Sequence, residues 1–137
     1  CQIGCHREPH KAIASLVSSM DHGYRVMSRS VMIDRDVDRY VDMFKNYYST
    51  LTKQRKLNSN LFLISMNELK NNLETNISDI YSKFGYEKST EFVAEISKLT
   101  IESKNFVSKH KYDLSEYSLN KDDIKKDFSD YYGSNIK

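Results

Sequence analysis

The sequence contains little proline and glycine and has no long apolar run. One proline and four glycines occur in 137 residues, so residues that end or bend helices are scarce. The most compact apolar run, residues 61–66, is far shorter than the roughly 20 residues that span a bilayer. A net charge of +2 is too small to indicate a nucleic-acid partner or an acidic membrane surface. We therefore predict long helices and no transmembrane segment.

Cysteine is also scarce, and both cysteines lie at the start of the chain. Together with His6 and His10, Cys1 and Cys5 provide the thiolates and imidazoles that zinc prefers. Their spacing does not fit the common zinc fingers, and a strand would place His6 on the face opposite the cysteines. We therefore predict no metal site. The cysteines are expected to be small buried side chains of a reduced, cytoplasmic protein.

Most of the chain has apolar residues at helical spacing. A first helix is predicted over about residues 9–20, ended by Asp21-His22-Gly23 and followed by an irregular stretch to Ile33. A long amphipathic helix follows, containing the aromatic residues of 40–48. These tyrosines and the basic residues after them could stack on single-stranded nucleic acid. Aromatic residues at this spacing are more often part of a core, so we expect no nucleic-acid partner.

Local signals mark the ends of the later elements. Residues 1–6 and 61–66 have the length and composition of strands. Gly85 is suited to ending a helix, and Ser89 and Asn120 are suited to capping the start of one. The helix after Ser89 is expected to bury an apolar face, comprising Phe92, Val93, Ile96, Leu99 and Phe106. Neither an internal repeat nor a low-complexity linker is present, which favours one domain.

The segment after the first predicted strand has the residues of a phosphate site. Arg7 precedes Pro9, and proline is favoured in the first turn of a helix. The guanidinium of an arginine can hold two phosphate oxygens at once, and the start of a helix carries partial positive charge. Ser15 lies on the second predicted turn, and helical side chains lean toward the N-terminus. Its hydroxyl can therefore approach an anion bound near the first turn.

This Arg-x-Pro element, with a serine eight residues after the arginine, resembles the 3'-phosphate-binding element of bacterial-type sulfotransferases. Those enzymes use 3'-phosphoadenosine-5'-phosphosulfate (PAPS) as the sulfuryl donor. The resemblance implies that Arg7 and Ser15 bind the 3'-phosphate of this nucleotide. Glu8 departs from the family, in which aspartate, histidine or asparagine is more usual.

Two later segments resemble the same family in the same order. Residues 61–66, the turn after them and the helix ending at Phe84-Gly85 are similar to a late strand, turn and helix of the family. Residues 106–119 resemble its Ser-x-His-x-Tyr tail. In the wider family this tail returns to the 3'-phosphate, which makes His110 and Lys109 candidate ligands. A histidine that only fixes a turn is an equal alternative for His110.

The resemblance implies an α/β fold of the P-loop kinase-like kind, with a parallel sheet flanked by helices. Residues 1–137 would be the C-terminal part of a single sulfotransferase domain, truncated at its N-terminus and mostly helical. The loop that binds the phosphosulfate lies upstream in the family, so this part alone is expected to be inactive, with no catalytic residue assigned. The acceptor would be a small molecule, glycan or lipid. Residues 21–60, which match the family poorly, are expected to help shape its pocket.

Two alternatives to a sulfotransferase remain open. One is another nucleotide-phosphate transferase, such as a kinase, which needs a Gly-x-x-x-x-Gly-Lys loop. The other is a non-catalytic helical interaction module, which needs no phosphate ligand.

Overall fold

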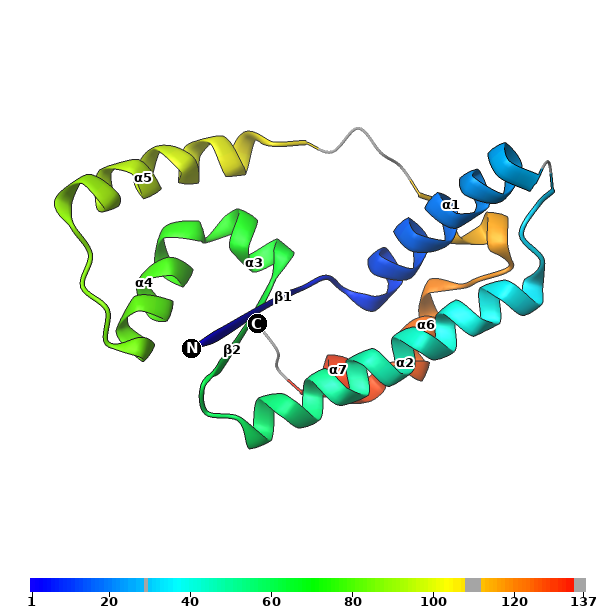
Figure 1. The fold of residues 1–137 in the computed structure, drawn as a ribbon, viewed down its shortest axis with the longest axis horizontal. Coiled ribbons are helices and arrows are strands. Elements are labelled where there is room, and N and C mark those ends of the chain that lie inside the picture. The colour runs from blue at the N-terminus through cyan, green and yellow to red at the C-terminus, as the bar shows by residue number, and fades with distance from the viewer. Residues whose placement is uncertain (29, 108–111, 135–137) are drawn as a thin grey trace. The chain divides into compact units, whose positions relative to one another are not determined.

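The structure, a computed structural model, describes residues 1–28, 30–107 and 112–134. It is mostly helical and contains a two-stranded sheet, as Figure 1 shows. The elements in chain order are β1 (Gln2–His6), α1 (Pro9–Ser28), α2 (Asp34–Leu57), β2 (Leu61–Ser65), α3 (Met66–Asn71), α4 (Leu73–Phe84), α5 (Thr90–Asn105), the 3₁₀ helix η1 (Leu114–Tyr117), α6 (Lys121–Asp127) and α7 (Ser129–Gly133). In the described part of the chain, no helix combines the length and apolar character needed to cross a membrane.

The chain divides into two compact units. The first, which we call the sheet unit, contains residues 1–7 and 55–107 of the described chain. The second, which we call the helical unit, contains residues 8–54 and 112–134. The mostly helical α/β composition predicted from the sequence is confirmed. The P-loop kinase-like arrangement stays a prediction.

The sheet unit is built on the parallel pairing of β1 with β2 (Figure 1). Gln2 lies opposite Leu61 and His6 opposite Ser65, so the two strands end at the same edge of the sheet. In β2, Leu63, Ile64 and Ser65 are buried. The two strand segments expected from the sequence are therefore present and parallel.

The helices of the sheet unit begin and end where local chemistry predicts. Gly85 follows α4 in the left-handed conformation, with φ of 69°, which glycine adopts without steric cost. The hydroxyl of Ser89 accepts the backbone N–H of Phe92 at the start of α5. The apolar face expected of α5 is only partly covered: Phe92 and Ile96 are half-buried and the ring of Phe92 stacks on Tyr81, but the helix has no fully buried residue and Leu99 is 40% exposed. Its contacts with α3 and α4 cover only part of its surface.

The prediction of buried cysteines is wrong. Cys1 and Cys5 are both exposed, and the thiol of Cys5 contacts the sulfur of Met66 at 3.1 Å. Only His6 of β1 is buried. A strand in a two-stranded sheet has a neighbour on one edge only, so fewer elements cover its side chains than in the middle of a larger sheet.

The helical unit has an apolar and aromatic core. Ile13, Ala14 and Val17 of α1 are buried, as are Ile124 and Phe128 in the C-terminal segment, and α1 packs against α6. The side-chain oxygen of Asn120 accepts the N–H of Asp122 and caps α6, which confirms the cap predicted from the sequence.

The first helix does not end at Asp21-His22-Gly23 as predicted, since α1 continues to Ser28. Asp21 is only 6% exposed. Its carboxylate accepts the Nε–H of Arg25 at 2.7 Å and the backbone N–H of Met32 at 3.0 Å. These two bonds stabilise the last turns of α1 and fix the segment that leads into α2. They offset the cost of Gly23 within a helix, about 1 kcal/mol relative to alanine.

The hydrogen bonds of Asp21 also set its titration. The N–H of Met32 and then the guanidinium of Arg25 lower the pKa of its carboxyl below the ordinary value. A carboxyl with a lowered pKa stabilises the fold at pH values above its unfolded-state pKa, about 3.9 for aspartate. That contribution is lost as the pH falls through the folded-state pKa.

We predict that Asp21→Ala lowers the free energy of unfolding by about 1–3 kcal/mol, because it leaves the buried N–H of Met32 without an acceptor. Asp38→Ala, at an exposed position of α2, is the matched control and should change stability little. The measurement is urea unfolding at neutral pH. Repeated in acid, the difference between the native chain and Asp21→Asn should shrink below about pH 3.9. Equal losses from the two alanine variants would contradict this role.

Candidate functional site

The segment predicted to bind phosphate joins β1 to α1. β1 ends at His6, the exposed Arg7 follows, and α1 begins at Pro9. The order of strand, arginine, proline and helix expected from the sequence is therefore present. Arg7 belongs to the sheet unit, and Ser15 belongs to the helical unit.

In the sheet unit, Arg7 follows the carboxyl end of β1. Because β1 and β2 are parallel, α3 begins at the same edge of the sheet, directly after Ser65. The hydroxyl of Ser65 accepts the backbone N–H of Glu68 at 3.1 Å. Ligands of open α/β sheets bind outside the carboxyl ends of parallel strands, so the position of Arg7 suits a binding residue.

In the helical unit, Glu8, Lys11 and Ser15 lie on one face at the start of α1. Their spacing of three and four residues places them one above the other along the helix. Ser15 is half-buried, and its backbone carbonyl accepts the hydroxyl of Ser19 at 2.8 Å. Lys11 therefore adds a cation to the face of Ser15. Lys11 was not among the ligands predicted from the sequence, although its separation of four residues from Ser15 could have identified it.

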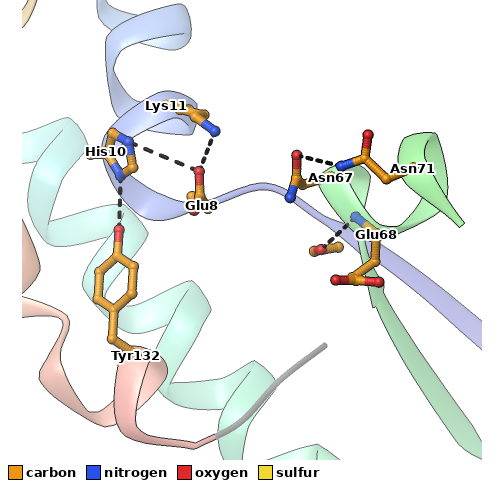
Figure 2. Close-up of polar contacts among 8 residues, drawn as sticks. Glu8, His10, Lys11, Asn67, Glu68, Asn71 and Tyr132 are labelled. Carbon is orange, nitrogen blue, oxygen red and sulfur yellow. Dashed lines mark hydrogen bonds and ion pairs between the residues drawn. The ribbon is translucent and has the colours of Figure 1, made fainter. Parts of the chain in front are cut away.

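Glu8 places a carboxylate at the start of α1. The carboxylate forms an ion pair with Lys11 (Figure 2), and the Glu8 carbonyl accepts the N–H groups of Lys11 and Ala12, both at 3.0 Å. Burial raises the pKa of Glu8, but the hydrogen bond and the charge of Lys11 outweigh burial and lower the pKa overall. The ionised carboxylate therefore occupies the position where a helix start favours an anion.

His10 connects the start of α1 with α7. Its Nδ1 lies 2.9 Å from the hydroxyl of Tyr132, and its Nε2 lies 4.0 Å from the Glu8 carboxylate (Figure 2). Burial is the largest cause that lowers the pKa of His10, and the charge of Lys121 acts in the same direction, whereas Glu8 raises the pKa. Burial also disfavours the charged form of Tyr132 and therefore raises the pKa of its phenol. Both groups are thus held in their neutral forms near neutral pH.

Sequence reasoning missed the contact of His10 with Tyr132. The two residues are 122 positions apart, and no local pattern indicates a pairing over that separation. His110 and Lys109, the other two ligands expected from the resemblance, lie outside the described residues. Among the residues that the structure describes, no group of three or more histidine, cysteine, aspartate or glutamate side chains could hold a metal ion.

Comparisons with protein-family models, curated proteins and solved structures find no match for this chain.

We predict that Glu8→Gln lowers the pKa of His10 further, because it removes the carboxylate that favours the imidazolium. Lys121→Met should raise that pKa, because it removes a repelling cation. Asp38→Asn is the control, since this carboxylate is not among the charges that act on His10. An NMR pH titration of the ring protons of His10 measures this pKa in each of the three variants. Shifts of the same sign in the Glu8 and Lys121 variants would contradict the assignment.

Proposed function

We propose that residues 7–15 bind the 3'-phosphate of PAPS, and that the chain is the nucleotide-binding part of a sulfotransferase. The reaction would transfer a sulfuryl group from the nucleotide to a hydroxyl or amine of a small-molecule, glycan or lipid acceptor. The observation that carries the proposal is the local order of β1, Arg7, Pro9 and α1. It supports the resemblance on which the assignment rests.

Arg7 is the principal phosphate ligand in this proposal. It is exposed at the carboxyl end of a parallel strand, and its guanidinium can donate two parallel hydrogen bonds to one phosphate group. Such charge-assisted bonds contribute more than neutral ones, about 1.5–3 kcal/mol each. Arginine also keeps its charge at every physiological pH.

Ser15 and Lys11 are the proposed ligands on α1. The hydroxyl of Ser15 would donate to a phosphate oxygen, and Lys11 would add a positive charge on the same face. Lys11 is paired with Glu8 in the free protein. Phosphate binding would therefore require Lys11 to exchange the Glu8 carboxylate for the phosphate. This exchange lowers the net contribution of Lys11 to the binding free energy.

No residue of this chain is assigned to the chemistry at the sulfur. In the family that the motifs resemble, a loop rich in lysine, glycine, serine and threonine holds the phosphosulfate, and this sequence contains no such loop. Sulfuryl transfer depends on positioning and on stabilising the charge that develops on the leaving phosphate. The part proposed for this chain is to anchor the nucleotide at its 3'-phosphate.

We predict that Arg7→Ala weakens the binding of adenosine 3',5'-bisphosphate by at least roughly ten- to a hundredfold, the value of one of its two charge-assisted hydrogen bonds. Ser15→Ala should weaken the binding of this nucleotide about fivefold, since a neutral hydrogen bond contributes about 1 kcal/mol. Calorimetric titration of the 137-residue chain measures both. Matched controls are Arg35→Ala, at an exposed position of α2, and Ser18→Ala, at another half-buried position of α1.

No detectable binding by the native chain, or unchanged affinity in Arg7→Ala, would overturn the proposed site. Equal losses in Arg7→Ala and Arg35→Ala would show that only the overall charge matters.

We predict that Glu8→Gln strengthens the binding of the same nucleotide by up to about fivefold, the range of a partly exposed ion pair. The substitution removes a charge that repels phosphate and releases Lys11 from its ion pair. Calorimetry at two salt concentrations measures the effect, which should be smaller at the higher one. Weaker binding in Glu8→Gln would show that this face of α1 does not receive the phosphate.

One observation favours the helical interaction module as a second candidate. α5 has no buried residue, and Val93, Leu99 and Ile101 are 40%, 40% and 64% exposed, so apolar side chains on this helix are accessible to a partner chain. The same titrations separate the two candidates, because an interaction module needs no affinity for the nucleotide.

A further inference from the structure

A hollow of about 310 Å³ lies in the helical unit, and none of the proposed phosphate ligands lines it. It is lined by Tyr24 of α1 and by four residues of α2, which are Asp36, Arg39, Tyr40 and Met43. Its volume is at the lower end of the range for small-molecule sites, about 300–1,000 Å³. The hollow therefore suits a ligand with a single ring.

The helical repeat brings the four residues of α2 together. Their separations of three, four and seven residues place them on one face of the helix. This face adjoins the buried stripe that contains Val37 and Val41. The wall of the hollow is therefore built on a helix that the core of its unit holds in place.

The lining residue of α1, Tyr24, lies close in the chain to the bonds of Asp21. Tyr24 lies three residues after Asp21 on α1, and the N–H of Met32 binds the Asp21 carboxylate just before α2 begins. The carbonyl of Ile33 then accepts the N–H groups of Asp36 and Val37 at 2.9 and 3.2 Å. The Asp21 carboxylate thus ties α1 to the residues just before α2, and these two helices line the hollow.

The hollow contains two opposite charges without ion-pair partners. Asp36 and Arg39 are three residues apart on one face, yet neither takes part in any ion pair within the described ranges. Elsewhere on the same helix, Asp42 and Lys45 have the same spacing and approach to 3.8 Å. Asp36 and Arg39 are therefore both available to a ligand that carries complementary charges.

The remaining lining residues favour an aromatic body. Tyr24 and Tyr40 are half-buried, and in the described chain neither ring packs against another ring. Aromatic rings pack favourably on other rings in offset or edge-to-face arrangements. The thioether of Met43, which is 49% exposed, is a soft apolar contact that adapts to such a ligand.

We propose that this hollow binds an aromatic α-amino acid or a close derivative with both an ammonium and a carboxylate group. The carboxylate binds the guanidinium of Arg39, the ammonium binds the carboxylate of Asp36, and the ring lies against Tyr24, Tyr40 and Met43. A ligand with negative charge only would meet repulsion from Asp36. A ligand with positive charge only would leave Arg39 without a partner. The proposal does not depend on nucleotide binding.

Three probes with the same ring test the charge requirement. They are L-tyrosine, tyramine, which lacks the carboxylate, and 3-(4-hydroxyphenyl)propionate, which lacks the ammonium. Titration of the 137-residue chain, followed by NMR, should show the highest affinity for tyrosine. Each of the other probes should bind about tenfold or more weakly, as expected for the loss of one charge-assisted hydrogen bond.

Two variants assign the charges to residues. Arg39→Gln should weaken the binding of tyrosine about tenfold, so that tyrosine no longer binds more tightly than tyramine. With Asp36→Asn, tyrosine should no longer bind more tightly than 3-(4-hydroxyphenyl)propionate. Arg35→Gln and Asp34→Asn, on the same helix but not lining the hollow, are the controls, and thermal unfolding verifies that each variant folds. Equal affinity for the three probes, no saturable binding, or an effect of Arg39→Gln no larger than that of Arg35→Gln would overturn the proposal. Tyrosine binding that persists in Arg7→Ala would show its independence from the nucleotide site.

Discussion

The helical unit depends on the burial of one tyrosine ring. Tyr48 of α2 is 2% exposed, and its ring packs edge-on against Phe128 at 5.6 Å and against Tyr131 at 4.8 Å between centroids. Such aromatic pairs add about 0.5–1.5 kcal/mol to the effect of burial alone. They hold the C-terminal segment against α2. Because Tyr132 follows Tyr131, the same packing brings its phenol within hydrogen-bonding distance of His10 at the start of α1.

Signals that act within a few residues made much of the fold predictable. Four helix boundaries follow from single residues: α1 begins at Pro9, α4 ends before Gly85, and the side chains of Ser89 and Asn120 cap α5 and α6. Each effect can be derived without knowledge of the rest of the chain. The strand β2 was also predictable, because its short apolar run is a local feature of the sequence. In the candidate site, the same reasoning predicted the positions of Arg7 and Ser15 relative to β1 and α1.

Several features of the structure were not predictable from local sequence signals, and the clearest of them depends on a contact between distant residues. The continuation of α1 past Gly23 requires the buried carboxylate of Asp21 to meet the N–H of Met32, 11 residues away. The exposure of Cys5 follows from how few elements cover β1 and not from its own chemistry. Glu8 was recognised only as a departure from a motif. Its ion pair with Lys11 places the Glu8 carboxylate at the start of α1 in the free protein. A long-range contact overrode the local preference only in α1, whereas the ion pair of Glu8 with Lys11 spans three residues and was open to local reasoning.

The central claim is that the segment from Arg7 to Ser15 receives a nucleotide phosphate. Mapping backbone amide shifts by NMR while adenosine 3',5'-bisphosphate is added tests this claim most directly, because it locates the ligand without any substitution. The account predicts that saturable shifts concentrate on residues 7–15, with Lys11 among the largest, and that the amides of Asp36 and Arg39 stay unchanged. Shifts confined to other segments, or no saturable shift at all, would contradict the account.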